Sequence, residues 1–169
     1  MTKLAGLLRA VNVGGTGKLP MADLRAMCSD IGFTNVKTLL ASGNVVFETE
    51  NSQADAKDML NAKLTAFFEV EIGLFMLNAD EMSAVNDANP FDDHSPSQVG
   101  VLFVDHMPSE DDCKNAKGLA DETLISGPGV LYVKYPSGMG KSRLIAPGSK
   151  TGTMRNMNTV LKLTTLLNE

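Results

Sequence analysis

A predicted β-hairpin between two predicted helices constrains the fold of the N-terminal half more than any other feature. Ser42-Gly43 is typical of a tight turn, and strand-like runs lie on both sides of it. The expected elements are strand 4–11, helix 20–31, strand 36–41, strand 44–49, helix 52–67 and strand 72–77. This βαββαβ order is typical of a ferredoxin-like, split βαβ half.

The second half repeats most of that order. The expected elements are strand 99–104, a helix capped by Ser109 and reaching 119, strand 123–126, strand 130–135 and a last helix over 154–167. The final strand of the pattern is missing from this prediction. The sequence therefore favours an α+β protein of two related ferredoxin-like halves, βαββαβ followed by an incomplete βαββα.

The proline-containing stretch 89–97 is the predicted boundary between the halves. It separates a first half, residues 1–88, from a second half, residues 89–169, which carries the C-terminal helix. A short helix is expected over 79–87, capped by Asn78. We expect the two halves to form one compact unit, because 169 residues suit a single core or two small halves that share one.

Composition and targeting signals favour a cytoplasmic globular protein. Hydrophobic residues make up 43% of the chain, and no segment reaches transmembrane length or resembles a signal peptide. Cys28 and Cys113 are far apart in sequence, which favours buried reduced thiols. We expect no membrane partner, and both a monomer and a homodimer stay open.

Charge is distributed unevenly along the chain, whose formal net charge is −5. Residues 1–45 carry five Lys/Arg against two acids, residues 46–133 carry four against seventeen, and residues 134–169 carry six against one. The net charge argues against a general nucleic-acid binder. If the two basic chain ends meet, they would form a local positive site. The alternative is that the acids simply populate solvated helices.

A glycine-rich segment, RAVNVGGTGKLP at residues 9–20, lies between the first strand and the first helix. It is not a P-loop, because Asn12 stands where the first glycine is needed, and it lacks the third glycine of the Rossmann fingerprint. Backbone amides of a glycine turn could still hold an anion, or the glycines could only permit tight turns. The candidate ligand-binding residues here are Arg9, Asn12, Gly14, Gly15 and Lys18.

Two further segments carry candidate anion-binding residues. Lys141 and Ser142 belong to a second near-P-loop, GMGKS, which also lacks its distal glycine. Arg155 and Asn156 fall in the first turn of the predicted last helix, where the helix dipole disfavours a cation unless an anion lies nearby. For Lys141 and Ser142 the alternative is a solvated loop. For Arg155, as for Arg9, the alternative is a structural salt bridge.

No constellation of catalytic residues or metal ligands is evident. His94 and His106 have no metal-ligand spacing with each other or with a cysteine. The catalytic residues are therefore unknown, no metal or cofactor is expected, and enzymatic activity stays open.

Three stretches, LLRAVNVGG, GFTNVKTLLASGNVVFET and GTMRNMNTVLKL, resemble the bacterial domain-of-unknown-function 1697 family. The resemblance covers essentially the whole chain and implies a small cytosolic α+β protein with no assigned substrate. The chain departs from the family pattern at two positions in these stretches, because Ala10 stands in place of a glycine and Met157 stands in place of an aromatic residue. The positions matching the family motifs are Arg9, Asn12, Gly14, Gly15, Ser42, Gly43, Asn44, Arg155, Asn156 and Thr159.

The hypothesis that combines these features is a small anionic or phosphorylated ligand bound between three elements. These are the glycine loop, the Ser42-Gly43-Asn44 turn and the start of the last helix. One alternative is a nucleic-acid-binding module that stacks bases on Phe47, Phe103, Tyr132 and Tyr135. Another is an interaction protein that pairs through the sheet edge left by the missing strand.

Overall fold

The computed structural model describes residues 1–13 and 17–169, which divide into two compact units. The first unit comprises Met1–Glu81 and Thr165–Glu169, and the second comprises Met82–Thr164. Each unit contains one four-stranded antiparallel sheet. The predicted α+β class with two related halves is confirmed.

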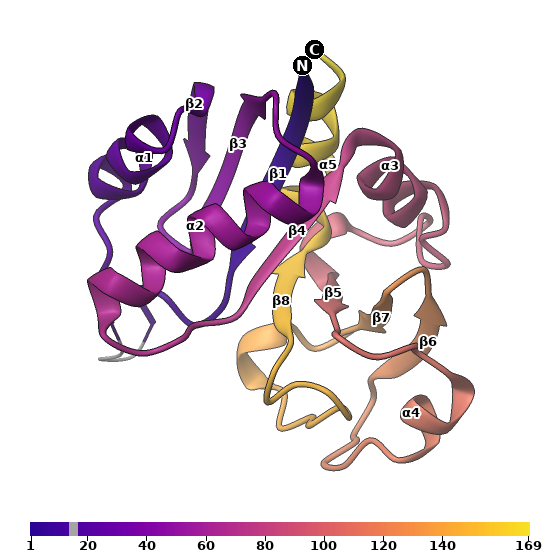
Figure 1. Cartoon of the computed structure of the whole chain (residues 1–169). Coiled ribbons are helices and arrows are strands. Elements are labelled where there is room, and N and C mark those ends of the chain that lie inside the picture. Colours follow the sequence, from indigo (N-terminus) through magenta and orange to yellow (C-terminus); the bar gives the residue numbers. More distant parts are fainter. Residues whose placement is uncertain (14–16) are drawn as a thin grey trace. The chain divides into compact units, whose positions relative to one another are not determined.

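The first unit has the predicted βαββαβ order (Figure 1). Its elements are β1 (Thr2–Leu8), α1 (Met21–Asp30), β2 (Thr34–Leu39), β3 (Asn44–Thr49), α2 (Gln53–Phe68) and β4 (Leu74–Asn78). The sheet order is β2-β3-β1-β4, and α1 and α2 cover one face. This arrangement is consistent with a ferredoxin-like half.

Local signals explain where the helices of the first unit begin and end. Pro20 directly precedes α1, and Gly32 follows it with a φ of +88°. Ser52 caps α2, since its hydroxyl accepts the N–H of Asp55 at 3.1 Å. These positions confirm the predicted helix boundaries to within one or two residues.

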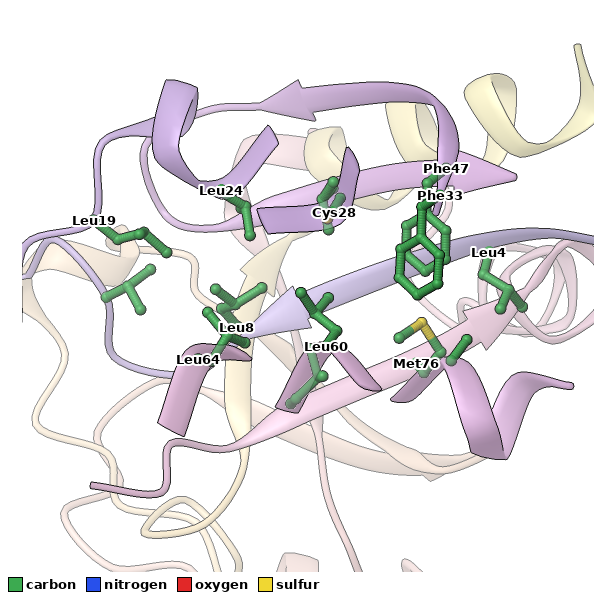
Figure 2. Packing of buried hydrophobic residues seen from close by; sticks show 14 residues of the cluster. Leu4, Leu8, Leu19, Leu24, Cys28, Phe33, Phe47, Leu60, Leu64 and Met76 are labelled. Carbon is green, nitrogen blue, oxygen red and sulfur yellow. The ribbon is translucent and has the colours of Figure 1, made fainter. Parts of the chain in front are cut away.

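The core of the first unit lies between the sheet and its two helices. Figure 2 shows the rings of Phe33 and Phe47 stacked, with centroids 4.1 Å apart. The buried residues around them come from β1, β3 and β4 of the sheet and from α1 and α2. At the end of α2, Phe68 packs against this core, whereas Phe67 is 43% exposed.

The second unit repeats the strand order of the first, β6-β7-β5-β8. Its elements are the greater part of α3 (Ala79–Asp87), β5 (Val99–Phe103), α4 (Glu110–Lys114), β6 (Thr123–Gly127), β7 (Val130–Lys134), β8 (Thr153–Asn156) and the greater part of α5 (Met157–Asn168), with 3₁₀ turns at Pro96–Gln98 and Met139–Lys141. The predicted helix after Ser109 is shorter than expected. Its capping box with Asp112 is present.

The prediction that the second sheet lacks its last strand is wrong. Strand β8 pairs with β5, with Arg155 opposite Val101 and Met154 opposite Leu102. The missing element is instead the second helix, whose place in the order is taken by the segment 135–152. A central strand needs partners on both sides for its backbone groups, and β8 supplies the second side of β5.

The last helix accordingly begins at Met157, three residues later than predicted. Asn156 ends β8, and its Oδ1 accepts the N–H of Thr159 at 3.0 Å. Asn78 ends β4 in the first unit, and its Oδ1 accepts the N–H of Glu81 at 2.9 Å. The same cap at the same step of both units supports the predicted internal repeat.

Candidate functional site

A cavity of about 370 Å³ lies at the end of β1 in the first unit. Its walls come from the segment after β1 and from the turn between α2 and β4. The lining residues are Arg9, Ala10, Val11, Gly17, Phe68, Val70, Glu71, Ile72 and Gly73. The cavity brings four residues of the RAVNVGGTGKLP segment, Arg9, Ala10, Val11 and Gly17, together with a turn that no sequence motif singles out.

Arg9 follows directly after β1 and is half-buried. Its backbone N–H donates to the carbonyl of Gly73 at 2.8 Å. A Cβ at Gly73 would lie 3.0 Å from both Cβ and Cδ of Arg9, so glycine at this position lets the arginine stem lie close to the backbone. Arg9 thus lines the cavity with a stem whose position is restricted by Gly73.

Gly17 has a steric role on another wall of the cavity. A Cβ there would lie 2.5 Å from Cε1 of Phe68, so no larger residue fits without moving the ring. Phe68 packs edge-on against Phe67, with ring centroids 4.9 Å apart. This glycine is therefore required for close contact between the loop and the end of α2.

Asn12 fixes the shape of the same loop. Its Nδ2 donates to the carbonyls of Leu19 at 2.8 Å and Ala41 at 2.7 Å, and its Oδ1 accepts the N–H of Leu19 at 2.7 Å. Its backbone has a φ of +57°, a region that asparagine tolerates better than most residues. These contacts give Asn12 a structural role, since its side-chain amide is already bonded to the loop and to the β2–β3 turn.

The Ser42-Gly43-Asn44 turn packs against the end of β1. The carbonyl of Gly43 accepts the N–H of Leu8 at 2.8 Å, and a Cβ at Gly43 would lie 2.6 Å from Cγ2 of Val11. Asn44 is fully buried, and its Nδ2 donates to the carbonyl of Leu39 and to Oγ of Ser42. Ser42 and Asn44 thus stabilise the hairpin.

The remaining candidates of the glycine segment have different outcomes. Gly14 and Gly15 lie outside the described residues. Lys18 is exposed and directly follows Gly17.

A second cavity, of about 510 Å³, lies in the second unit between the segments 118–122 and 137–143. Lys141, Ser142 and Arg143 line it together with Asp121 and Glu122. The hydroxyl of Ser142 donates to Oε1 of Glu122 at 2.6 Å, and the N–H of Ala120 donates to Oε2 at 2.7 Å. These hydrogen bonds hold the pKa of Glu122 below its usual range, and the bond from Ser142 has the largest effect.

The carboxylates of this second cavity are engaged with its own walls. Ser137 donates to Asp121 at 2.5 Å, and Ser142 is the partner of Glu122. The hydroxyl of Ser142 is therefore used to join the two segments, although Lys141 and Arg143 are exposed.

Arg155 and Asn156 belong to the second unit, whereas Arg9 and the glycine segment belong to the first. Arg155 lies in β8 rather than in a first helical turn, so the helix-dipole argument for it is wrong. Its side chain is 7% exposed, and Nη1 donates to Thr153 Oγ1 at 2.6 Å and to the Met154 carbonyl at 2.9 Å. Burial lowers the pKa of Arg155 to about 10.

The two basic chain ends meet within the first unit, beside the last turn of α5. Lys3 lies 3.8 Å from Glu48, and Lys37 lies 3.4 Å from Glu169. Lys3 also donates to the carbonyl of Leu166 at 3.5 Å. Because both lysines are paired with carboxylates, this meeting place is not the local positive site that the charge pattern suggested.

Titratable groups elsewhere form pairs rather than a metal centre. His94 lies 2.7 Å from Asp93 and His106 lies 2.9 Å from Asp112. Across residues 1–13 and 17–169, no group of three or more His, Cys, Asp or Glu residues could hold a metal ion. Neither cysteine forms a disulfide, and burial raises the pKa of the Cys28 thiol to about 12.

The four aromatic residues proposed as a base-stacking platform are all buried. Phe47 and Tyr132 are fully buried, Phe103 is 2% exposed, and Tyr135 is 6% exposed. Base stacking requires an accessible ring face, so these positions do not provide one. In addition, no described helix is long and apolar enough to cross a membrane.

The fold and its cavities define a small α+β protein built from two related sheet units. The chain belongs to the family described as protein of unknown function (DUF1697), whose model matches residues 1–132. The resemblance read from the sequence is confirmed. No curated protein matches the chain.

A solved structure shows the same fold. It is described as the structure of conserved bacterial protein SP0830 from Streptococcus pneumoniae. The two chains share 22% identity and a TM-score of 0.81, and the alignment covers 100% of this chain and 99% of that one.

Several residues of the first cavity were not found by sequence reasoning. Phe68, Val70, Glu71, Ile72 and Gly73 lie in or next to the α2–β4 turn. The one available signal was Gly73, a glycine inside the predicted strand 72–77. Nothing in the local sequence connects this turn to Arg9.

Proposed function

We propose that the protein binds a small anionic ligand in the cavity of the first unit, with Arg9 as the group that pairs with the anion. The observation that supports this most is Arg9 itself, a half-buried arginine lining a cavity of about 370 Å³. Small-molecule sites typically measure about 300–1,000 Å³ and combine apolar walls with a few polar groups.

The position of the arginine stem supports the same proposal. A guanidinium presents several N–H donors in a planar fork that matches carboxylate and phosphate oxygens. Ordering a flexible side chain on binding costs free energy. The contact with Gly73 already restricts the Arg9 stem, so less of that cost falls on the ligand.

The other candidate residues take different parts in this proposal. Asn12 holds the loop that lines the cavity, and Asn44 holds the hairpin that packs against the end of β1, through the hydrogen bonds of their side chains. Lys18 would add positive charge to the same region. A ligand-binding role for the candidates of the second unit, Lys141, Ser142, Arg155 and Asn156, stays a prediction.

The test is a thermal-shift and calorimetric titration of the whole protein with four probes: inorganic phosphate, acetate, benzoate and phenyl phosphate. A ligand at about 100 times its Kd should stabilise the protein by roughly 2.7 kcal/mol. Arg9→Met keeps the apolar stem and removes the charge, so it should abolish the shift.

Arg25→Met is the matched control. Arg25 is an exposed arginine of the same unit, and its Nη1 donates to Thr38 Oγ1 at 2.6 Å. It should retain wild-type binding. The proposal fails if none of the four anions binds the wild type, or if binding survives in Arg9→Met.

A further inference from the structure

Apolar side chains form part of the walls of the Arg9 cavity. Val11, Phe68, Val70 and Ile72 line it beside the arginine. Val70 is 61% exposed, and Phe67, next to the lining residue Phe68, is 43% exposed. Exposed large apolar side chains that gather beside a polar group are a feature of ligand-binding surfaces.

Phe68 contributes a ring of fixed position. Gly17 lies against one part of it, and the ring of Phe67 packs against it at right angles. Fixed aromatic rings gain most from contact with flat or compact apolar groups. The cavity therefore offers a ligand more than a point of positive charge.

Glu71 restricts the charge that a ligand can carry. Glu71 lines the same cavity, and its Oε1 accepts a hydrogen bond from Nδ2 of Asn61 at 3.5 Å. One cationic and one anionic residue thus face the same small volume. A singly charged anion gains from Arg9 with little repulsion, whereas a second negative charge is opposed by Glu71.

We infer that the ligand of this cavity is a compact apolar carboxylate, such as an aromatic or branched aliphatic acid, rather than a phosphorylated compound. This inference rests on the proposed function and narrows its ligand class. Arg9 pairs with the carboxylate, Phe68, Val70 and Ile72 contact the apolar body, and Glu71 disfavours dianions. The cavity volume, near the lower end of the usual range, suits a ring-sized body.

Calorimetry with benzoate, acetate and phenyl phosphate tests the inference on the whole protein. Benzoate should bind at least about tenfold more tightly than acetate, since it buries a ring that acetate lacks. Benzoate should also bind more tightly than phenyl phosphate. Equal affinities for benzoate and acetate, or a preference for phenyl phosphate, would overturn the inference. The proposed anion site would still be supported in that case if Arg9→Met abolished binding.

Two variants separate the apolar contact from the charge effect. Val70→Ser should lower the affinity for benzoate by about threefold or more and leave the affinity for acetate unchanged. Its control is Ile145→Ser, which alters a similarly exposed residue, 60% accessible, outside the cavity lining. Loss of acetate and benzoate affinity to the same extent in Val70→Ser would contradict the apolar contact.

Glu71→Gln should improve phenyl phosphate affinity by about threefold to tenfold while changing benzoate less. Glu69→Gln removes a nearby exposed carboxylate that does not line the cavity, and it should have a smaller effect. Equal effects of the two variants would show that Glu71 does not select against dianions. Absence of binding by all three probes would defeat the inference, and the proposed function would fail as well if inorganic phosphate also did not bind.

Discussion

The stem of Arg9 lies close to the backbone of Gly73, and both residues line the cavity of the first unit. The backbone N–H of Arg9 donates to the Gly73 carbonyl at 2.8 Å, and a Cβ at Gly73 would lie 3.0 Å from two carbons of the arginine stem. The contact joins the end of β1 to the turn before β4, so one strand end and one turn together restrict the stem of Arg9.

Gly73→Ala should therefore weaken anion binding without removing any charge. The added methyl group displaces the Arg9 stem, and a displaced guanidinium pairs less well with a carboxylate. We expect benzoate affinity to fall by about fivefold or more in calorimetry. Gly140→Ala is the control, since a Cβ there meets nothing within 4 Å. Unchanged benzoate binding in Gly73→Ala would contradict the proposed placement of Arg9.

Asn12→Ala should destabilise the first unit markedly. It removes three side-chain hydrogen bonds and leaves alanine at a φ of +57°. The free energy of unfolding should fall by roughly 2–3 kcal/mol in urea denaturation.

Asn35→Ala provides the comparison for Asn12. Asn35 also has a positive φ, +50°, but it is exposed and its Nδ2 donates to Glu48. The free energy of unfolding should fall less in Asn35→Ala than in Asn12→Ala, by about 1 kcal/mol. Equal losses for both variants would show that the Asn12 network contributes little beyond its backbone conformation.

The stability of the second unit should depend on the ionised form of Asp112. Burial by itself raises the pKa of Asp112, but hydrogen bonds from His106 and from the Ser109 N–H outweigh it and hold the pKa below its usual value. Because the folded pKa is lower than the unfolded one, Asp112 stabilises the fold above the unfolded pKa, near 3.9. That contribution is lost as the pH falls through the folded pKa.

Urea denaturation across about pH 3 to pH 6 measures this effect. The loss of stability in acid should be shallower in Asp112→Asn than in the wild type. Asp111→Asn changes an exposed carboxylate in the same helical turn and should retain the wild-type slope. An unchanged slope in Asp112→Asn would rule out a stabilising role for its charge.

Tyr132→Phe should cost about 1–2 kcal/mol of stability. The buried hydroxyl of Tyr132 donates to the carbonyl of Val85 at 2.5 Å and joins β7 to α3 within the second unit. Without it, the carbonyl of Val85 loses a buried partner. Urea denaturation would measure the loss, and a stability equal to wild type would mean that the freed carbonyl finds another donor.

Much of the fold follows from local sequence patterns. In the first unit, Pro20, Ser52 and the Ser42-Gly43 turn mark helix starts and the hairpin where the structure has them. Each of these signals affects only the residues next to it, through a fixed φ or a side-chain cap. Such a signal can therefore be located without tertiary information.

Strand β8 could not be predicted in the same way. Thr153–Asn156 is only four residues long and leads directly into a helix, so the helical period of 157–167 extends into it. Its strand conformation depends on pairing with β5, far earlier in the chain. Tertiary pairing overrides local preference in such short segments.

The candidate site was predicted in part. Arg9 and Gly17 were part of a segment that stood out by composition, and both line the first cavity. Val70, Glu71 and Gly73 line it from a turn more than fifty residues later, and only the antiparallel pairing of β1 with β4 brings that turn to Arg9. A local motif cannot carry such a relationship, because it depends on strand register.

An NMR titration with benzoate would locate the proposed anion site at Arg9. We expect the backbone amide shifts on binding to concentrate at Arg9, Gly17, Val70 and Gly73, and we expect Arg9→Met to remove them. Shifts concentrated instead at the second cavity, around Gly138 and Lys141, would contradict the placement of the site. The absence of any shift at millimolar benzoate would contradict the claim that this cavity binds an apolar carboxylate.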